Sequence, residues 1–210
     1  MEIITKRIEK INWNAVVAMA TAGSLQTGDK ITDELIAGEK ITYVVADISP
    51  EEIYFISEDC LDQKVQWNKN GENTGGFKNS AVCRFLNTTV WNMLPEELRA
   101  VISERECLQI VEGKEERYPL KLWLPTECEV FGNDCGSEAK EGRQFEIFKD
   151  PRNRVKLAGD GGEQTDWWLS SVCKIASAYT CSVNYCGCAN YLSCSVVLRV
   201  PVCFSIKINR

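Results

Sequence analysis

The chain of 210 residues contains no histidine. Histidine is the usual general base near neutral pH and the commonest protein ligand for metals. Its absence excludes Ser-His-Asp and Cys-His catalysis, because both depend on an imidazole to accept a proton.

The sequence also lacks any block of lysine or arginine, and its net charge is -6. Proteins that grip a phosphate backbone concentrate basic residues on one surface, so we expect no nucleic-acid partner. Long hydrophobic runs are missing as well. The longest uncharged early stretch, residues 11–25, is interrupted by Asn12, Asn14 and Ser24, and we therefore expect no membrane insertion.

The start of the chain resembles a secretion signal only superficially. Lys6 and Arg7 precede an apolar stretch, but Glu2 and Glu9 lie among them and the apolar core, residues 15–20, is short. We expect no Sec signal peptide. The eleven cysteines are an odd number, so a complete set of intrachain disulfides would leave one thiol over, and we expect mostly free thiols.

What is present is typical of a soluble globular protein, with 44% hydrophobic and 26% charged residues. The length suits one large domain, which we place at residues 31–210, preceded by a helical extension, residues 1–30, packed on it. Local patterns predict an α+β fold of small sheets and short helices. The expected elements are a helix within 8–26, a hairpin of Lys40–Asp47 and Glu51–Ser57, helices starting at Ser80 and Pro95, a strand Leu120–Leu124, a short turn or helix from Thr126, an irregular region 131–163, and one or two strands within 196–208.

One segment, Ser170–Ser195, has an unusual composition and is called the window below. Its 26 residues hold six serines, five cysteines and three tyrosines, but only one charge, Lys174. A buried strand would be rich in valine, leucine and phenylalanine, and a solvated loop would carry charges and proline. A mixture of tyrosine with small polar residues is typical of antibody-like binding surfaces, where tyrosine supplies contact area and serine or asparagine adaptable hydrogen bonds.

The window has a second property. Apart from Lys174, every residue type in it can be reached from an asparagine codon by replacing the two adenines, and tryptophan, methionine, glutamine and glutamate, which cannot be reached, are missing. Targeted mutagenesis of adenines would produce such a mixture, including surface cysteines.

Several short motifs follow one another along the chain in a distinctive order. They are Gly75-Gly76-Phe77, Ser80, Arg84-Phe85-Leu86-Asn87, Leu122–Val130, Trp167-Trp168-Leu169-Ser170 and Leu198-Arg199-Val200-Pro201. In this order they resemble a bacterial and phage domain of unassigned function, members of which have the C-type lectin fold and some of which serve as variable proteins of diversity-generating retroelements. The resemblance covers about residue 31 to the C-terminus. Two departures are Phe77 and the sequence of the closing strand, where the family pattern leads us to expect tryptophan and Gly-Val-Arg-Pro-Ala.

The resemblance implies a C-type-lectin-like domain whose variable region, about residues 170–195, recognises a ligand without catalysis. The expected partner is a protein or glycan on a cell surface, with no cofactor, and oligomerisation of the chain is left open. A gut bacterium or its phage is the implied source, and the virion or the bacterial cytoplasm the implied location. The expected ligand-binding residues are Cys173, Ala176, Tyr179, Cys181, Ser182, Asn184, Tyr185, Cys186, Cys188, Asn190, Tyr191, Ser193 and Cys194.

Alternatives remain open for several of these residues. Cys186-Gly187-Cys188 could serve a zinc or iron-sulfur site, but the cysteine spacing matches no known ligand pattern, and we expect no metal. If the chain were instead related to the sulfatase-modifying oxidoreductases, Cys186 and Cys188 would be its reactive pair. A third alternative is a phage structural subunit whose window is an oligomer contact.

Two aromatic patterns yield expectations about exposure. Trp167 and Trp168 alternate across a strand, so one should be buried and the other should face the loops. Tyr179, Tyr185 and Tyr191 recur every six residues among polar neighbours, and we expect them to be exposed.

Overall fold

The computed structural model describes residues 11–137 and 141–208. The helices in these ranges are α1 (Trp13–Thr21), α2 (Ala81–Phe85), α3 (Trp91–Met93), α4 (Glu96–Val101) and α5 (Glu127–Phe131), with single-turn or irregular helices η1 (Phe77–Asn79), η2 (Leu86–Val90), η3 (Glu146–Lys149) and η4 (Pro151–Arg154). The strands are β1 (Lys30–Glu34), β2 (Lys40–Ile48), β3 (Glu52–Ser57), β4 (Val65–Gln66), β5 (Arg105–Val111), β6 (Lys114–Leu120), β7 (Lys156–Leu157), β8 (Gln164–Thr165), β9 (Trp167–Val172), β10 (Tyr179–Val183), β11 (Ala189–Ser193), β12 (Val197–Leu198) and β13 (Cys203–Lys207). The named strands pair antiparallel in small sheets, which confirms the α+β class.

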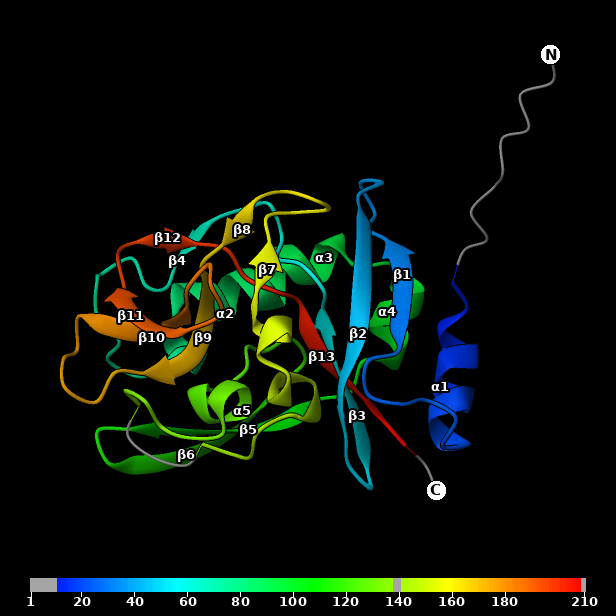
Figure 1. Cartoon of the computed structure of the whole chain (residues 1–210), viewed down its shortest axis with the longest axis horizontal. Coiled ribbons are helices and arrows are strands. Elements are labelled where there is room, and N and C mark those ends of the chain that lie inside the picture. Colours follow the sequence, from blue (N-terminus) through cyan, green and yellow to red (C-terminus); the bar gives the residue numbers. More distant parts are fainter. Residues whose placement is uncertain (1–10, 138–140, 209–210) are drawn as a thin grey trace, which may run out of the picture.

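The main sheet has the strand order β1-β2-β3-β13 (Figure 1). The predicted hairpin of β2 and β3 is confirmed, and β13 from the end of the chain pairs with β3. The apolar residues of these strands are buried on both faces, because α1 and the α2–α4 region cover one face and the segment around η3 covers the other. Because β13 pairs with β3, the polypeptide between these two strands forms one long insertion whose two ends lie side by side.

The predicted N-terminal helix is shorter than its sequence pattern. Helix α1 starts after Asn12, whose side chain accepts a hydrogen bond from the Ala15 amide, and the start of the predicted helix, residues 8–10, lies outside the described residues. The helix packs on the main sheet through Trp13, whose ring lies 5.8 Å from those of both Tyr43 and Phe204. The extension therefore shares the core of the domain.

Helix caps agree well with the sequence prediction. The Ser80 hydroxyl accepts from the Cys83 amide at 3.0 Å and starts α2, which continues through η2 into α3. Thr126 and Glu129 form a reciprocal capping box around α5. Pro95 was expected as the first helical residue of α4 but instead precedes it as the N-cap.

The predicted strand Leu120–Leu124 is wrong. Strand β6 ends at Leu120, and the next residues run through the core as irregular extended chain with a single bridge from Trp123 to Cys203. Their alternation is nevertheless real, because Leu122 and Leu124 enter one core cluster and Trp123 enters another. The side chain of Asn87 replaces a neighbouring strand, accepting from the Leu122 amide and donating to its carbonyl at 2.8 Å.

The described residues of the region 131–163 are largely irregular, as expected, and include η3, η4 and β7. Two aromatic residues of this region, Phe145 and Phe148, are buried and belong to the smaller core cluster together with Trp123 and Trp167. Within the described residues, no helix has both the length and the hydrophobicity needed to cross a bilayer.

Candidate functional site

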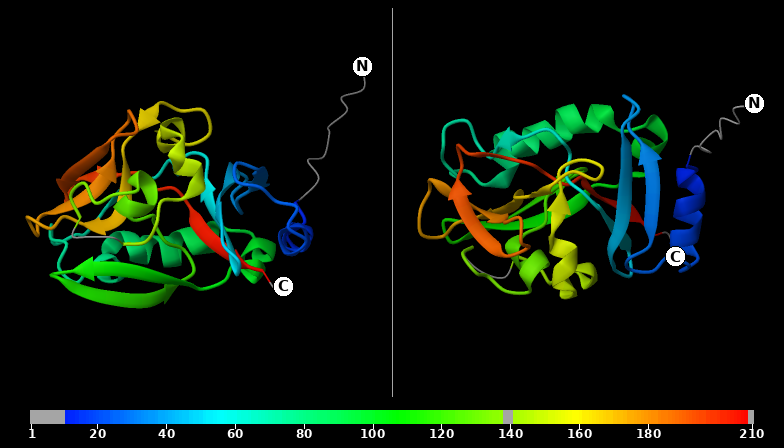
Figure 2. Two further views of the ribbon diagram at one scale, coloured as in Figure 1. Left: turned by 60° about the horizontal axis from the view of Figure 1, so that its bottom comes forward. Right: turned by 45° about the horizontal axis from the view of Figure 1, so that its top comes forward.

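The window forms a second, three-stranded sheet with the order β11-β10-β9. This sheet lies at the end of the molecule opposite α1 (Figures 1 and 2). Strand β10 is central, paired with β9 on one side and with β11 on the other. The sheet is thus the element that decides which window residues reach solvent.

Strand β9 is buried along its whole length. Trp167 and Trp168 are both fully buried, so the prediction that one of them faces the loops is wrong. Both faces of β9 are covered, because Trp168 belongs to the larger core cluster and Trp167 to the smaller one. The indole of Trp168 donates to the Val65 carbonyl at 2.9 Å, and that of Trp167 donates to the Arg154 carbonyl at 3.0 Å.

Four of the predicted ligand-binding residues are buried, which corrects the expectation that they are exposed. They are Cys173, Cys181, Ser182 and Cys194. Cys181 and Ser182 lie on the central strand β10, where neighbouring strands and packed layers exclude solvent from both faces. Composition failed here because small polar residues fill tight space under the surface as readily as they occur on it.

The remaining predicted residues are exposed or half-buried. Tyr179, Tyr185 and Tyr191 are 45%, 55% and 38% exposed, which confirms the expectation for the three tyrosines. Cys186 and Cys188 are also exposed. Those half-buried are Ala176, Asn184, Asn190 and Ser193.

Large exposed apolar side chains concentrate in and beside the window. Elsewhere in the described residues, the large exposed apolar side chains are Met19 and Ile36. The other large exposed side chains, which we call the tyrosine surface, are Ile175, Tyr179, Tyr185, Tyr191, Val196 and Val197.

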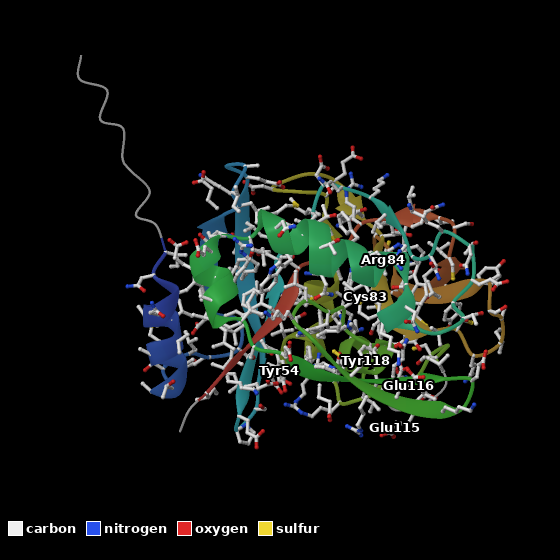
Figure 3. The ribbon with its side chains drawn as sticks, turned by 180° about the vertical axis from the view of Figure 1, so that it is seen from behind. Tyr54, Cys83, Arg84, Glu115, Glu116 and Tyr118 are labelled. Atoms are coloured by element: carbon white, nitrogen blue, oxygen red, sulfur yellow. The ribbon has the colours of Figure 1, made fainter. Side chains whose placement is uncertain are left out.

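Other surfaces of the protein carry paired charges instead. On the β5–β6 hairpin (Figure 3), Glu115 lies 2.8 Å from Arg117, and Glu116 lies 2.6 Å from Lys78. By contrast, contiguous exposed apolar area marks binding sites on soluble proteins.

Hydrogen bonds from backbone amides to one side chain hold the turn between β10 and β11 in its conformation. The side-chain oxygen of Asn184 accepts from the amides of Cys186 at 3.0 Å and Cys188 at 2.9 Å. Gly187 has a φ of 80°, and a Cβ there would lie 3.1 Å from Val155. Asn184 is therefore part of the frame, while the two thiols project from the turn.

None of the eleven cysteines forms a disulfide in the structure. Burial raises the pKa of the Cys194 thiol to about 11 and also raises that of Cys181, which makes both poor nucleophiles. In the described part of the chain, no three Cys, Asp or Glu side chains converge in a way that would hold a metal ion.

Sequence reasoning missed two residues that hold the surface in place. The first is Asn73, which lies in a polar loop far from the window in sequence. Its side-chain amide donates to the carbonyls of Tyr179 at 2.7 Å and Ala176 at 3.3 Å, and its backbone amide donates to the Ser177 carbonyl. Only main-chain atoms of the window accept these bonds, so the side chains of this loop are free to differ.

The second is Glu127, a fully buried carboxylate on α5. One of its oxygens accepts from the amides of Gly136 and Ser137 and from the Ser137 hydroxyl, at 2.8–2.9 Å. The Lys174 amide donates to the Gly136 carbonyl, and a Cβ at Gly136 would overlap the Tyr191 ring. Glu127 therefore fixes the loop on which Tyr191 rests. No sequence motif indicates this role, because acidic residues are common at the start of a helix.

A network of acids continues beneath this loop. The Glu127 amide donates to the Ser171 hydroxyl, which in turn donates to Glu141. Glu129 forms an ion pair with Arg105, whose guanidinium lies 4.2 Å from the centre of the Trp123 ring. Burial raises the pKa of Glu141 to about 7, against hydrogen bonds from the Ile110 amide and Ser171 that lower it.

Comparisons with known proteins assign the chain to a family. A family described as a domain of unknown function, DUF6273, matches residues 51–208. No curated protein and no solved structure matches the chain. The matched range runs from the start of β3 to the end of β13 and so includes the window and its supports. Because the match spans most of the sequence, the protein belongs to the DUF6273 family.

Proposed function

We propose that the protein is a non-catalytic recognition protein that binds its ligand through the tyrosine surface and the neighbouring thiols of Cys186 and Cys188. The observation that carries the proposal is the concentration of exposed apolar side chains in a segment with one charge. Tyrosine contributes a large contact area for two side-chain rotors, so ordering it on binding costs little entropy. A neutral surface of this kind fits a protein or glycan rather than a polyanion.

The proposed frame is C-type-lectin-like. Strand β13 pairs with β3, so the two ends of the long insertion between them lie side by side. The window lies within this insertion, on a small sheet of its own. Asn73 and Glu127 hold the loops through main-chain atoms, and the tryptophans of β9 supply the core below. Because of these supports, folding does not depend on which side chains occupy the exposed positions.

We further propose that adenine-directed mutagenesis by a retroelement diversifies the surface. The burial pattern sharpens this proposal, because Cys173, Cys181, Ser182 and Cys194 have room for small side chains only. Diversification should therefore be broad at the exposed positions and restricted at the buried ones.

A displayed library tests the binding role. Randomising Tyr179, Tyr185, Cys186, Cys188 and Tyr191 should leave most members folded and yield binders to an unrelated protein such as lysozyme. The matched control randomises Glu112, Lys114, Glu115 and Arg117 on the β5–β6 hairpin, which is equally exposed but charged. Equal numbers of binders from the two libraries, or a mostly unfolded first library, would refute the role.

Sequencing tests the proposed origin of the surface. In a population carrying this gene, substitutions should fall in the codons of the window, trace to adenines of a near-identical template copy, and accompany a reverse transcriptase gene. Codons 173, 181, 182 and 194 should vary only among small residues. Substitutions spread evenly over the gene, or no template copy nearby, would exclude a retroelement and leave the binding role to the library experiment.

A further inference from the structure

An open hollow of about 620 Å³ adjoins the tyrosine surface. Tyr185 and Val197, two members of that surface, form part of its wall. Most of the remaining wall comes from β8, β12 and the residues that flank them, and Figure 1 shows β8 and β12 above the three-stranded sheet of the window. A ligand that binds the tyrosine surface therefore has this hollow within its reach.

The charged side chains that line the hollow lie outside the window and are mostly acidic. Three are carboxylates, from Asp62, Glu163 and Asp166, and two are basic, from Lys64 and Arg199. Arg199 is already engaged, because its guanidinium donates to the Asp62 carboxylate at 3.2 Å and its side chain is only 17% exposed. Within the described residues, Glu163 and Asp166 take part in no ion pair. The hollow therefore has a surplus of negative charge beside a window that contains no acidic residue.

An acid and an aromatic residue are joined at this hollow. The Asp166 carboxylate accepts a hydrogen bond from the backbone amide of Tyr185 at 2.8 Å, and the Tyr185 side chain is 55% exposed. Val197 and Leu198 add apolar surface beside them. A guanidinium group is attracted by carboxylates and by the face of an aromatic ring, and the aliphatic stem behind it packs on apolar side chains. The hollow combines the contacts that an arginine side chain requires.

We propose that this hollow is an anchor site for an arginine side chain of a protein ligand. The inference rests on the proposed function and narrows it, because it selects a protein rather than a glycan as the ligand. The guanidinium lies against Tyr185 and is bound by Glu163 and Asp166, while the stem contacts Val197 and Leu198. Arginine is enriched at protein interfaces and among the residues that dominate their affinity. Since the carboxylates lie outside the window, the anchor site keeps them when the window varies.

Titration of the isotope-labelled full-length protein with N-acetyl-arginine amide tests the anchor site, with backbone amide chemical shifts as the readout. N-acetyl-citrulline amide has nearly the same shape without the charge and is the matched ligand. The amides of Tyr185 and of residues 163–166 should shift, and the arginine compound should bind about fivefold more tightly than the citrulline compound. Methyl glucoside and N-acetylglucosamine are titrated in parallel to test for a saccharide site.

Two charge reversals in the hollow have opposite expected effects on the affinity for the arginine compound. Glu163→Lys should weaken binding about threefold and Lys64→Glu should strengthen it by a similar factor, the size of effect usual for exposed charge pairs. Both side chains are exposed, so neither change should unfold the protein. The matched controls are Glu115→Lys and Lys114→Glu on the β5–β6 hairpin, which should leave the affinity unchanged. Tyr185→Ser should lower it.

Three results would overturn the anchor site. They are equal affinity for the arginine and citrulline compounds, no shift of the Tyr185 amide, and binding of a saccharide at these amides in place of the arginine compound. The library experiment remains a separate test, because it selects binders through the tyrosine surface itself. Library binders to lysozyme without binding of the arginine compound would refute the anchor site and leave the recognition role intact.

Discussion

Replacing Trp168 by alanine is expected to lower the free energy of unfolding by about 3–5 kcal/mol, the usual cost of removing a buried aromatic side chain. The indole is fully buried in the larger core cluster, and its loss also removes the hydrogen bond that it donates to the Val65 carbonyl. Since domains are stable by only about 5–15 kcal/mol, the variant should be marginally folded. Urea unfolding followed by tryptophan fluorescence and circular dichroism measures the change.

Tyr185→Ser is the matched control for that experiment. Tyr185 lies in the same sheet region but is exposed, so its replacement should change the unfolding free energy by no more than about 0.5 kcal/mol. The contrast between a costly frame residue and a neutral surface residue is what a display protein requires. A loss of several kcal/mol in Tyr185→Ser would mean that the tyrosine is part of the core and would count against the proposed role.

The second expected result is an unusual pH dependence. The pKa of Glu141 is raised from 4.5 to about 7 in the folded protein, mainly by burial. A carboxyl whose pKa is higher in the folded state favours folding fully at pH values below its unfolded pKa, and this contribution is lost as pH rises through the folded pKa. The free energy of unfolding should therefore fall by about 3 kcal/mol between pH 4.5 and 7.

Glu141→Gln isolates this effect. The amide keeps the size of the side chain and can still accept from the Ile110 amide, but it does not ionise. Urea titrations between pH 5 and pH 8 should give a flatter profile for the variant and a greater stability than wild type at pH 8. Parallel profiles for the two proteins would show that Glu141 is not the source of the pH dependence.

The network of buried acids also gives a route by which a change in the ionisation of Glu141 would affect the tyrosine surface. Ser171 connects Glu141 to the start of α5, and Glu127 on that helix holds the loop under Tyr191. At high pH, ionisation of the buried Glu141 carboxyl would therefore weaken the support of Tyr191. The supports of the tyrosine surface thus include a network of buried polar groups, and such a network is destabilised when any one partner is missing.

Local signals in the sequence predicted local structure well. The β2–β3 hairpin follows from β-branched and aromatic residues on either side of Ser49-Pro50, and the starts of α2 and α5 follow from Ser80 and Thr126. The exposure of the three tyrosines followed from the polarity of their neighbours. Each of these depends on residues that are close together along the chain, where geometry and hydrogen bonding are decided within a few positions.

By itself, then, the sequence determined the class of fold, the position of the unusual window and the absence of histidine chemistry. Only the tertiary structure decided which window residues reach solvent, because burial of Cys181 and Trp168 depends on strands and layers that arrive from distant parts of the chain. The same holds for Asn73 and Glu127, whose roles arise from loops brought to them by folding. Small polar residues have no strong preference for surface or interior, so their location is set by what packs against them.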